Sequence, residues 1–375
     1  MYTFKNSIGN TIKIFADNIE ATALEQIKDL AECEAYRQEK IRIMPDVHAG
    51  KGCVIGTTMT VTNKLTPNLV GVDIGCGVTV AKIRLDGPGR SKSGRSKLDL
   101  HKLDNAIKKY IPSGFSVKDK PLPFDFSKLR CARYVDLKRA YHSIGTLGGG
   151  NHFIEVGKDT EGALYLLIHS GSRNLGVGVC SYYQKRAQKQ IKDTGKDYVH
   201  RDLAWLEDSL FEDYLNDMEI TQRYASHNRD VMLQTLTEKM NLTCEKIVET
   251  IHNYIDTKNM ILRKGAVSAQ KGELLVIPLN MRDGTLLCRG KGNPDWNYSA
   301  PHGAGRILSR TKARELLVMK DFVQSMDNIY STSVSKKTLD EAPQAYKPKE
   351  EILQAIEPTA EVLTVIRPIY NFKAG

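Results

Sequence analysis

Aspartate and cysteine side chains that could bind a metal ion stand close together in one glycine-rich segment. Asp73 and Cys76 lie three residues apart in GVDIGCG (71–77), where glycines let the backbone turn sharply. A hard carboxylate oxygen and a soft thiolate can then face one ion, and a thiolate has enough lone pairs to bridge two. A thiolate with two or three imidazoles suits a transition metal, with zinc the first expectation from ligand type alone. The plain alternative is a tight turn around a buried cysteine.

Five of the nine histidines stand beside glycine, asparagine or other polar motif residues. They are His48, His152, His169, His252 and His302. A single histidine beside a glycine is more often a turn or surface residue than a ligand. His252 lies between Ile251 and Ile255 in a pattern that we interpret as helical, where a core histidine is the plain alternative. Only the combination of these histidines with Asp73 and Cys76 favours a metal site.

The segment GTLGGGNHFIE (145–155) is a candidate phosphate-binding site, because its glycines expose backbone N–H groups. It lacks the Lys-Ser/Thr pair of a P-loop, and a flexible turn before a strand is the alternative. If the residues after Gly150 were helical, Asn151 and Glu155 would share one face. His152 would then point elsewhere, so that one short segment could serve a metal and a nucleotide.

A strand end and a polar turn place an arginine near another histidine. In IHSGSRNLG (168–176), an apolar strand ends at His169, and the turn carries Arg173 towards a helix. A strand that leads to a helix N-terminus favours anion binding.

The segment PHGAGRILSRTKAR (301–314) combines a histidine turn with a basic repeat. Gly303 and Gly305 leave space beside His302, and arginines recur every four residues at 306, 310 and 314. On a helix over 306–320 they would form one basic stripe. Arginine binds phosphate through two parallel hydrogen bonds, so we favour phosphate contacts over a solvated helix face.

The elements that must position these residues are a mixture of helices and strands. The pattern predicts helices over 19–32, 181–193, 306–320 and most of 203–255, the last broken near Asn228 and Asn241. It predicts strands over 78–85 and 163–168, and short strands over 260–290. Repeats and an inter-domain linker are absent from the sequence, so we expect one domain over residues 1–375.

Composition limits the classes of function. With 54 Lys+Arg against 44 Asp+Glu, the net charge of +10 weakly favours a polyanionic partner. The basic segment DGPGRSKSGRSK (86–97) predicts a solvated loop, with an RNA contact as the alternative. The sequence has no signal-peptide pattern at 1–10 and no apolar run long enough for a membrane span. Seven dispersed cysteines without a CxxC pair argue against a disulfide framework, and we expect a cytoplasmic protein.

Taken together, these segments resemble the RtcB family of RNA-splicing ligases. The motifs that carry the resemblance are MPDVHAGKG (44–52), GVDIGCG, GTLGGGNHFIE, HSGSRNLG, HNY (252–254), KGAVSA (264–269), HGAGR, DEAPQAYK (340–347) and RPIYNFKAG (367–375). Their order spans nearly the whole chain. The resemblance implies an α+β fold, with mixed sheets around a central metal and nucleotide cleft.

The resemblance also implies roles for individual residues. A two-manganese site would comprise Asp73, Cys76 in the bridging position, His152, His169 and His252. His302 would carry a covalent guanylate, and Asp46 would orient it. Nucleotide contacts would come from Asn151, Glu155, Asn280, Thr285, Gly303, Ala304, Gly305, Arg306, Tyr346 and Lys373, with Tyr346 stacked on guanine and Glu155 and Lys373 at its edge. Arg173 and Arg310 would contact RNA phosphates.

The implied activity is GTP- and manganese-dependent joining of an RNA 3′-phosphate or 2′,3′-cyclic phosphate end to a 5′-hydroxyl end, by a monomer, in RNA repair or tRNA splicing. One departure concerns the nucleotide pocket. The family has Gly-Ser before a methionine, whereas Leu279 and Asn280 stand here. This predicts a diverged bacterial-type paralogue whose nucleotide pocket differs in detail from that of the family.

The same residues are compatible with two other functions, which belong to different classes of protein. A dinuclear metal phosphoesterase acting on cyclic phosphate ends of RNA would need the metal ligands but not His302, Tyr346 or Lys373. A basic RNA-binding protein with a structural metal would explain the charge but not the convergence of Cys, His and Asp. A covalent nucleotide adduct on the protein separates the ligase from both.

Overall fold

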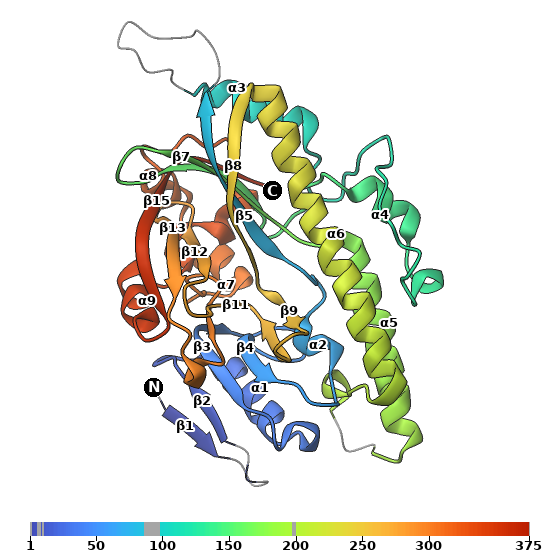
Figure 1. Ribbon diagram of the computed structural model, residues 1–375. Helices are drawn as coiled ribbons and strands as arrows, with labels where there is room; N and C mark the ends of the chain where they lie inside the picture. Colours follow the sequence, from blue (N-terminus) through green and yellow to red (C-terminus); the bar gives the residue numbers. More distant parts are fainter. Residues whose placement is uncertain (1, 6–8, 10, 86–97, 197–199, 375) are drawn as a thin grey trace, which may run out of the picture.

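The computed structural model describes residues 2–5, 9, 11–85, 98–196 and 200–374, and the basic segment 86–97 lies outside this part. Three sheets and several helices of different lengths make up the chain (Figure 1), which confirms the α+β class. One small sheet pairs β11 (Ala266–Ser268) with β14 (Ser299–Pro301), and His302 follows β14 directly.

A six-stranded mixed sheet forms the N-terminal part of the fold. Its strands, in spatial order, are β1 (Tyr2–Lys5), β2 (Thr11–Ile14), β3 (Ile41–His48), β4 (Ile55–Thr60), β10 (Ile261–Lys264) and β9 (Asn253–Asp256). Only the β2–β3 pair is parallel among these described strands. Residues 41–47 of β3 are all buried, so Asp46 is held in the interior.

A seven-stranded antiparallel sheet supports most of the site. Its spatial order is β12 (Leu274–Asn280), β13 (Gly284–Gly290), β15 (Ala360–Lys373), β6 (Phe153–Lys158), β7 (Leu164–Ser170), β5 (Gly77–Leu85) and β8 (Leu242–Ile251). The predicted strands over 78–85 and 163–168 are confirmed as β5 and β7, and the short strands over 260–290 are confirmed as well.

The helices lie around the sheets. They are α1 (Ala21–Ala31), α2 (Pro67–Val70), α3 (Leu100–Tyr110), α4 (Leu137–Ser143), α5 (Arg173–Asp193), α6 (Asp208–Met240), α7 (Arg310–Leu316), α8 (Met319–Ser325) and α9 (Lys349–Ile356). Short 3₁₀ turns cover Glu34–Tyr36, Ala132–Tyr134, Arg201–Leu203, Pro294–Trp296, Lys336–Glu341 and Pro343–Ala345. The predicted helices over 19–32 and 181–193 are confirmed by α1 and α5.

Two predictions about the segment 203–255 are wrong. The helix α6 is not broken at Asn228, because this side chain is buried and hydrogen-bonds the backbone of Gly145 and Thr146 instead of its own helix. The helix ends at Asn241, whose left-handed backbone (φ +53) terminates it. The chain then forms β8, so His252 follows a strand and is not helical.

The helix predicted over 306–320 is also wrong in its extent. Regular helix covers only Arg310–Leu316, and α8 begins separately at Met319. Arg306 instead pairs with Tyr346 in an isolated antiparallel β-bridge, so the three arginines do not form a helical stripe.

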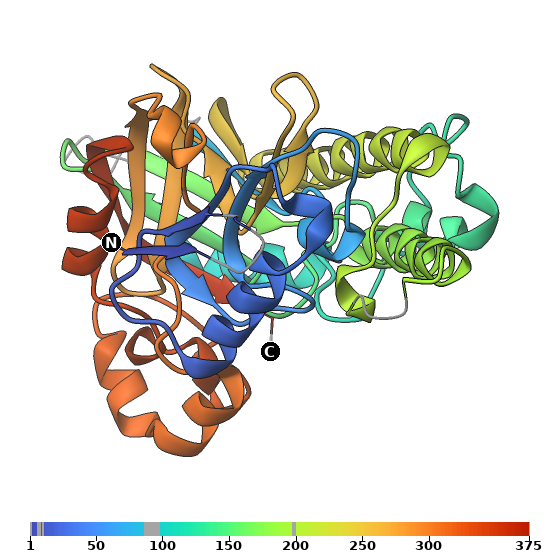
Figure 2. The same cartoon turned by 90° about the horizontal axis from the view of Figure 1, so that it is seen from below.

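The two long helices α5 and α6 run side by side along one flank of the molecule in both views (Figures 1 and 2). Helix α6 packs against β5, β7 and β8 and so covers one face of the seven-stranded sheet. Among the described residues, no helix combines the length and the apolar character that a membrane crossing needs. All seven cysteines are free, and only Cys244 is exposed.

Candidate active site

The register of four neighbouring strands gathers the predicted metal ligands at one edge of the seven-stranded sheet. Phe153 of β6 pairs with His169 of β7, so His152 lies at the end of β6 beside it. Gly77 of β5 pairs with Ser170 on one side and with Ile251 of β8 on the other. Cys76, just before β5, therefore lies next to His169, and His252, just after β8, lies one strand further along the sheet, although the four segments are far apart in the sequence.

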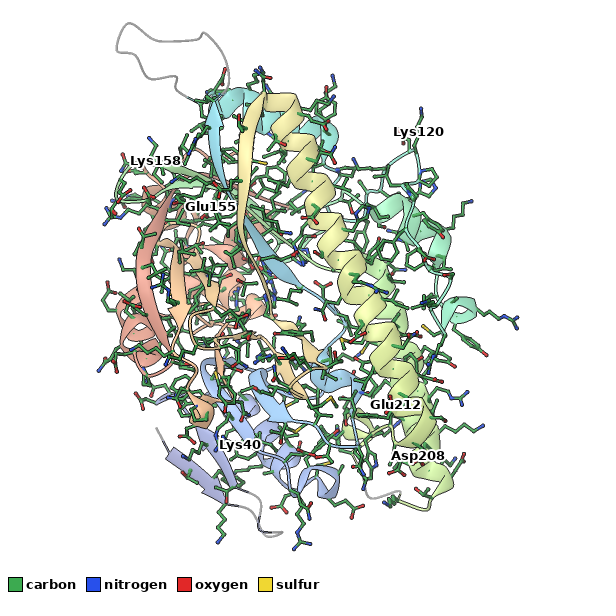
Figure 3. The ribbon with its side chains drawn as sticks, in the orientation of Figure 1. Lys40, Lys120, Glu155, Lys158, Asp208 and Glu212 are labelled. Carbon is green, nitrogen blue, oxygen red and sulfur yellow. The ribbon has the colours of Figure 1, made fainter. Side chains whose placement is uncertain are left out.

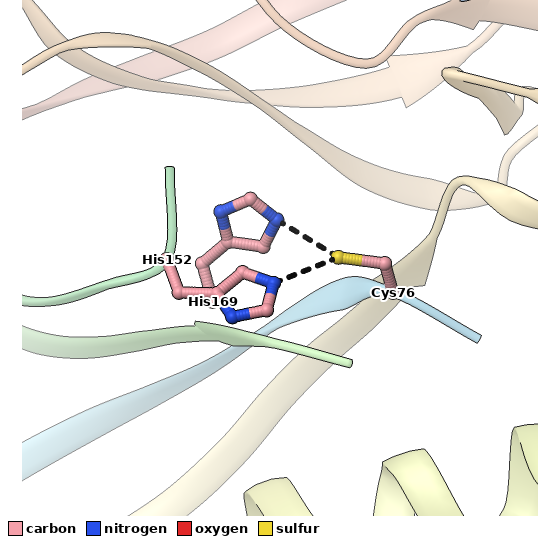
Figure 4. Close-up of side chains that lie close together, drawn as sticks. All are labelled: Cys76, His152 and His169. Carbon is pink, nitrogen blue, oxygen red and sulfur yellow. Dashed lines mark hydrogen bonds between the residues drawn. The ribbon is translucent and has the colours of Figure 1, made fainter. Parts of the chain in front are cut away.

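Cys76, His152 and His169 form a buried cluster that could hold a metal ion. The Sγ atom of Cys76 lies 3.4 Å from Nε2 of His152 and 3.3 Å from Nε2 of His169 (Figure 4). Nδ1 of His152 donates to the carbonyl oxygen of Leu147 at 2.9 Å, which leaves its Nε2 lone pair facing Cys76. Burial, and then the charge of Asp73, raise the pKa of the Cys76 thiol well above its usual range.

Asp73 extends this cluster with a carboxylate. Its Oδ2 lies 3.1 Å from Nε2 of His152, and its Oδ1 accepts a hydrogen bond from the backbone of Ser172. Although burial alone would raise the pKa of Asp73, its contact with His152 outweighs that effect and holds the pKa far below its usual range. A Cβ atom at position 171 would lie 2.2 Å from the Asp73 carboxylate. Glycine at this position therefore allows the carboxylate to lie against the backbone of residue 171. One carboxylate, one thiol and three imidazoles form a donor set that suits a transition metal.

His302 lies beside this cluster, with its ring 4.9 Å from that of His252. Its Nδ1 donates to Oδ2 of the fully buried Asp46 at 2.6 Å, and its backbone N–H donates to the same oxygen at 3.0 Å. This contact fixes the tautomer and leaves Nε2 with a free lone pair. Gly305 (φ +72) makes the approach of the two segments possible, since a Cβ there would lie 2.7 Å from Cα of Asp46.

A cavity of about 410 Å³ opens beside His302. The predicted site residues that line it are Asn151, Glu155, His169, His252, Asn280, Thr285, His302, Gly303, Ala304, Gly305, Arg306, Arg310, Tyr346 and Lys373. Asp73, Cys76, His152 and Arg173 do not line the cavity but lie beyond His169.

The helical interpretation of the residues after Gly150 is wrong, and the alternative of a turn before a strand is confirmed, because Phe153–Lys158 is a strand. Alternation along an extended chain nevertheless places residues 151, 153 and 155 on one side, and all three line the cavity. Phe153 is a lining residue for which no role was predicted.

Glu155 is a buried carboxyl group in the cavity wall (Figure 3 labels it). Its Oε2 accepts a hydrogen bond from Asn371 at 2.8 Å, whereas its Oε1 has no partner. Burial raises the pKa of Glu155 to about 8. Asn371, from the opposite strand of the β6–β15 pair, lies in the RPIYNFKAG motif, but no role was predicted for it.

A network of charges borders the other side of the cavity. Glu341 is buried, pairs with Lys373, lies 2.8 Å from Arg310 and accepts a hydrogen bond from the Tyr346 hydroxyl at 2.7 Å. Although burial alone would raise its pKa, Lys373 and Arg310 together hold the pKa of Glu341 at about 2. The guanidinium of Arg306 lies over the Tyr346 ring, 5.0 Å from its centroid. Glu341 belongs to the DEAPQAYK motif, but no role was predicted for it.

Three predicted residues, Asn280, Arg306 and Arg310, have their polar groups engaged within the protein. Both polar atoms of Asn280 bond to the turn that joins β12 and β13, with Nδ2 donating to Asp283 and Oδ1 accepting from the backbone of Arg282 and Asp283. Arg310 pairs with Asp340 at 2.6 Å as well as with Glu341. Because these groups already have partners within the protein, the structure does not support the predicted guanine contact of Asn280 or the predicted RNA contact of Arg310.

Arg173 is held in a strained conformation next to the metal cluster. It begins α5 with a left-handed backbone (φ +56), which costs a non-glycine residue on the order of 1 kcal/mol. One of its terminal nitrogens lies 3.4 Å from Nδ1 of His152, and the other donates to the carbonyl oxygen of Gly114 at 3.3 Å. Burial lowers the pKa of Arg173.

Unsatisfied polar atoms concentrate in this region. Nine buried side-chain nitrogen or oxygen atoms of the described residues lack a hydrogen-bond partner. Five of them belong to the site, namely Asp46 Oδ1, Glu155 Oε1, His169 Nδ1, Arg173 Nε and Asn371 Oδ1. Because buried polar atoms are nearly always paired in a folded protein, this concentration indicates that the site is built to receive polar ligands.

Comparison with known proteins agrees with the geometry. The family model described as tRNA-splicing ligase RtcB matches residues 26–132 and 129–374. The RNA-splicing ligase RtcB of Escherichia coli K12 is 31% identical over 374 aligned residues that cover 88% of each chain. The tRNA-splicing ligases RtcB of Aeropyrum pernix and Methanococcus maripaludis are 25% and 26% identical, covering 90% and 91% of this chain and 89% and 88% of their own.

Proposed function

Because the chain belongs to the RtcB family of RNA-splicing ligases and is an RNA ligase, we propose that it joins RNA 3′-phosphate or 2′,3′-cyclic phosphate ends to 5′-hydroxyl ends through a guanylated His302. The proposed cofactors are GTP and two manganese ions. Family membership does not favour the phosphoesterase or the RNA-binding protein as alternatives.

The observation that carries the proposal is the contact between His302 and Asp46. With Nδ1 donating to the carboxylate, Nε2 keeps its lone pair and can act as a nucleophile. Attack of Nε2 on the α-phosphorus of GTP would form a nitrogen–phosphorus bond and release pyrophosphate. The guanylate would then pass to the RNA 3′-phosphate, and the 5′-hydroxyl would displace GMP to form the new phosphodiester.

The residues that would hold the metal are Asp73, Cys76, His152, His169 and His252. The orphaned Nδ1 of His169 and the mixed donor set fit a transition metal. Bound manganese would neutralise phosphate charge and polarise the phosphorus centre for attack. The neighbouring protein groups contribute by fixing the donor atoms, as the Leu147 carbonyl does for His152.

The nucleotide would occupy the cavity beside His302. Glu155 and Lys373 supply polar groups for the edge of guanine, Tyr346 supplies a ring, and Asn151 supplies an amide for a phosphate. Residues 303–305, with two glycines, would let the α-phosphate approach His302. Thr285 and Asn280 lie on the wall formed by β12 and β13.

The test is a covalent label on the protein. GTP labelled in its α-phosphate, incubated with the protein and manganese, should leave a label that is stable at neutral pH and lost in acid. The His302→Ala variant should give no label, whereas the His101→Ala control, at an exposed histidine remote from the cavity lining, should label normally. An unlabelled wild type with intact metal content would overturn the proposal.

A further inference from the structure

The histidine rings of the site follow one another away from the nucleotide cavity. Successive ring centroids are 4.9 Å apart for His302 and His252, 5.2 Å for His252 and His169, and 5.1 Å for His169 and His152. Arg173 continues this row, because its guanidinium reaches from His152 to the carbonyl oxygen of Gly114. The row therefore joins the nucleotide cavity at one end to the loop that contains Gly114 at the other.

The residue after Gly114 is the most exposed large apolar side chain among the described residues. Phe115 is 94% exposed. Its backbone is nevertheless tied down, because its carbonyl oxygen accepts a hydrogen bond from Arg139 at 3.0 Å and the N–H of Gly114 donates to Gly148 at 2.9 Å. An aromatic ring that faces water on an anchored backbone segment, which Arg173 links to His152, offers a flat surface for a ligand.

The chain segment that contains Phe115 is basic. Residues 113–142 contain seven Lys or Arg and three Asp. Arg133 and Lys138 are exposed, and Lys120 extends outward from the loop near α4 (Figure 3). Basic side chains together with an exposed aromatic ring are the combination that binds single-stranded nucleic acid, since the cations contact the backbone and the ring stacks on a base.

The geometry of the proposed displacement indicates which RNA end approaches from the Phe115 side. This step rests on the proposed function, in which GMP leaves from the cavity beside His302. In an in-line displacement the nucleophile approaches the phosphorus from the side opposite the leaving group. The 5′-hydroxyl strand must then arrive from the side away from the cavity, which is the end of the row where Phe115 lies. We propose that the first base of the 5′-hydroxyl RNA strand stacks on Phe115.

The experiment measures binding of a single-stranded RNA with a free 5′-hydroxyl and a fluorophore on its 3′ end, by fluorescence anisotropy in manganese without GTP. Phe115→Ala should weaken binding about tenfold, as expected for loss of one base–aromatic stack, while Phe115→Trp should retain the wild-type affinity. The matched control is Tyr134→Ala, since Tyr134 is also exposed in this region but is already stacked on Tyr182 at 4.5 Å. That variant should bind like the wild type.

A substrate without its first base provides the decisive comparison. Removing that base should weaken binding to the wild type by the same factor and should not weaken binding to Phe115→Ala any further. Unchanged affinity in Phe115→Ala, or equal losses on base removal in both proteins, would overturn the proposal; a role for Phe115 in docking another protein predicts the first result. Because the assay contains no GTP, a wild type that forms no guanylate would refute the proposed function without affecting this outcome.

Discussion

The proposed metal site and the proposed nucleotide cavity share His169 and His252 but are supported differently. Four of the five proposed metal ligands lie at or next to the ends of adjacent strands, β6, β7, β5 and β8, whose register fixes their spacing. The far wall of the cavity comes from irregular segments around residues 305–310 and 340–346, whose positions depend on charge pairs with Asp340 and Glu341. Strand pairing positions most of the metal half of the site, which comprises Asp73, Cys76, His152, His169 and His252. The nucleotide half comprises the cavity wall at residues 305–310 and 340–346, which buried charge pairs position, together with Glu155 and Lys373.

This difference predicts that each half can fail without the other. A variant in the nucleotide half should keep its metal and lose only the steps that involve guanosine. A variant in the metal half should lose every step, including joining of RNA that has already been activated. The predictions that follow use this separation, in order of decreasing expected effect.

The largest effect is expected at His302, where the two halves meet. His302→Ala should reduce GTP-dependent joining by about 10⁴-fold or more, because removing a nucleophile removes the covalent route. It should bind manganese normally and should join RNA whose 3′ end already carries guanylate, since that substrate omits only the His302 step. Ligation assays with the two substrates measure this. Full joining of ordinary ends by the variant would contradict the mechanism.

Cys76→Ser tests the metal half. Exchanging the thiolate for a hydroxyl should weaken manganese binding by roughly 10- to 100-fold, the range seen when metal sites lose supporting groups. Joining should fail even with activated RNA, which distinguishes this variant from His302→Ala. Metal content after gel filtration and activity on activated RNA are the measurements. Cys244→Ser, at the exposed cysteine, is the control; equal metal content in both variants would exclude Cys76 from the site.

Lys373→Ala tests the charge network of the nucleotide half. Its ammonium pairs with Glu341 and faces the cavity, so its removal should raise the KM for GTP about tenfold, the effect of losing one charge-assisted hydrogen bond. Use of ATP should change little, so the preference for GTP should narrow. Lys158→Ala is the control, because Lys158 is exposed at the far end of β6 (Figure 3). An unchanged ratio of GTP to ATP use would mean that the base does not lie at Lys373.

The grouping of Cys76 with His152 and His169 could be predicted from sequence, because glycines near these residues mark places where the backbone turns sharply or packs closely, and the structure brings the three side chains together. Their role as metal ligands stays a prediction. The error about His252 shows the limit: its apolar neighbours fit a helix or a strand equally well over so few residues. The pairing of β8 with β5, which decides the question, is a long-range contact that local periodicity does not encode.

The nucleotide half was less predictable for the same reason. Asn371 and Glu155 face each other only because β15 pairs with β6 across more than 200 residues. The arginines at 306, 310 and 314 have helical spacing, yet attraction to the buried Asp340 and Glu341 brings all three to the same acidic pair without a continuous helix. A four-residue repeat cannot reveal an acidic partner that lies about 30 residues further along the chain.

The smallest expected effect concerns pH and Glu155. Its pKa of about 8 means that the carboxyl group is mostly protonated at pH 7 and mostly ionised at pH 9. Guanine presents N–H donors at its edge, so binding requires the carboxylate, and the proton must leave. Affinity for GTP should therefore rise about tenfold between pH 7 and pH 9, following the ionised fraction. Below pH 7 it should fall further, because protonation removes the acceptor.

Calorimetry can isolate this proton. In the His302→Ala background, which forms no adduct, GTP binding at pH 7 measured in buffers of different ionisation heat gives the number of protons released. Adding Glu155→Gln should lower that number by nearly one, because the amide has no proton to lose and the phosphates contribute equally in both proteins. The added substitution should also flatten the dependence of affinity on pH. The same proton release with and without Glu155→Gln would show that the base does not engage this carboxyl group, and the guanine edge would then have to lie against another wall of the cavity.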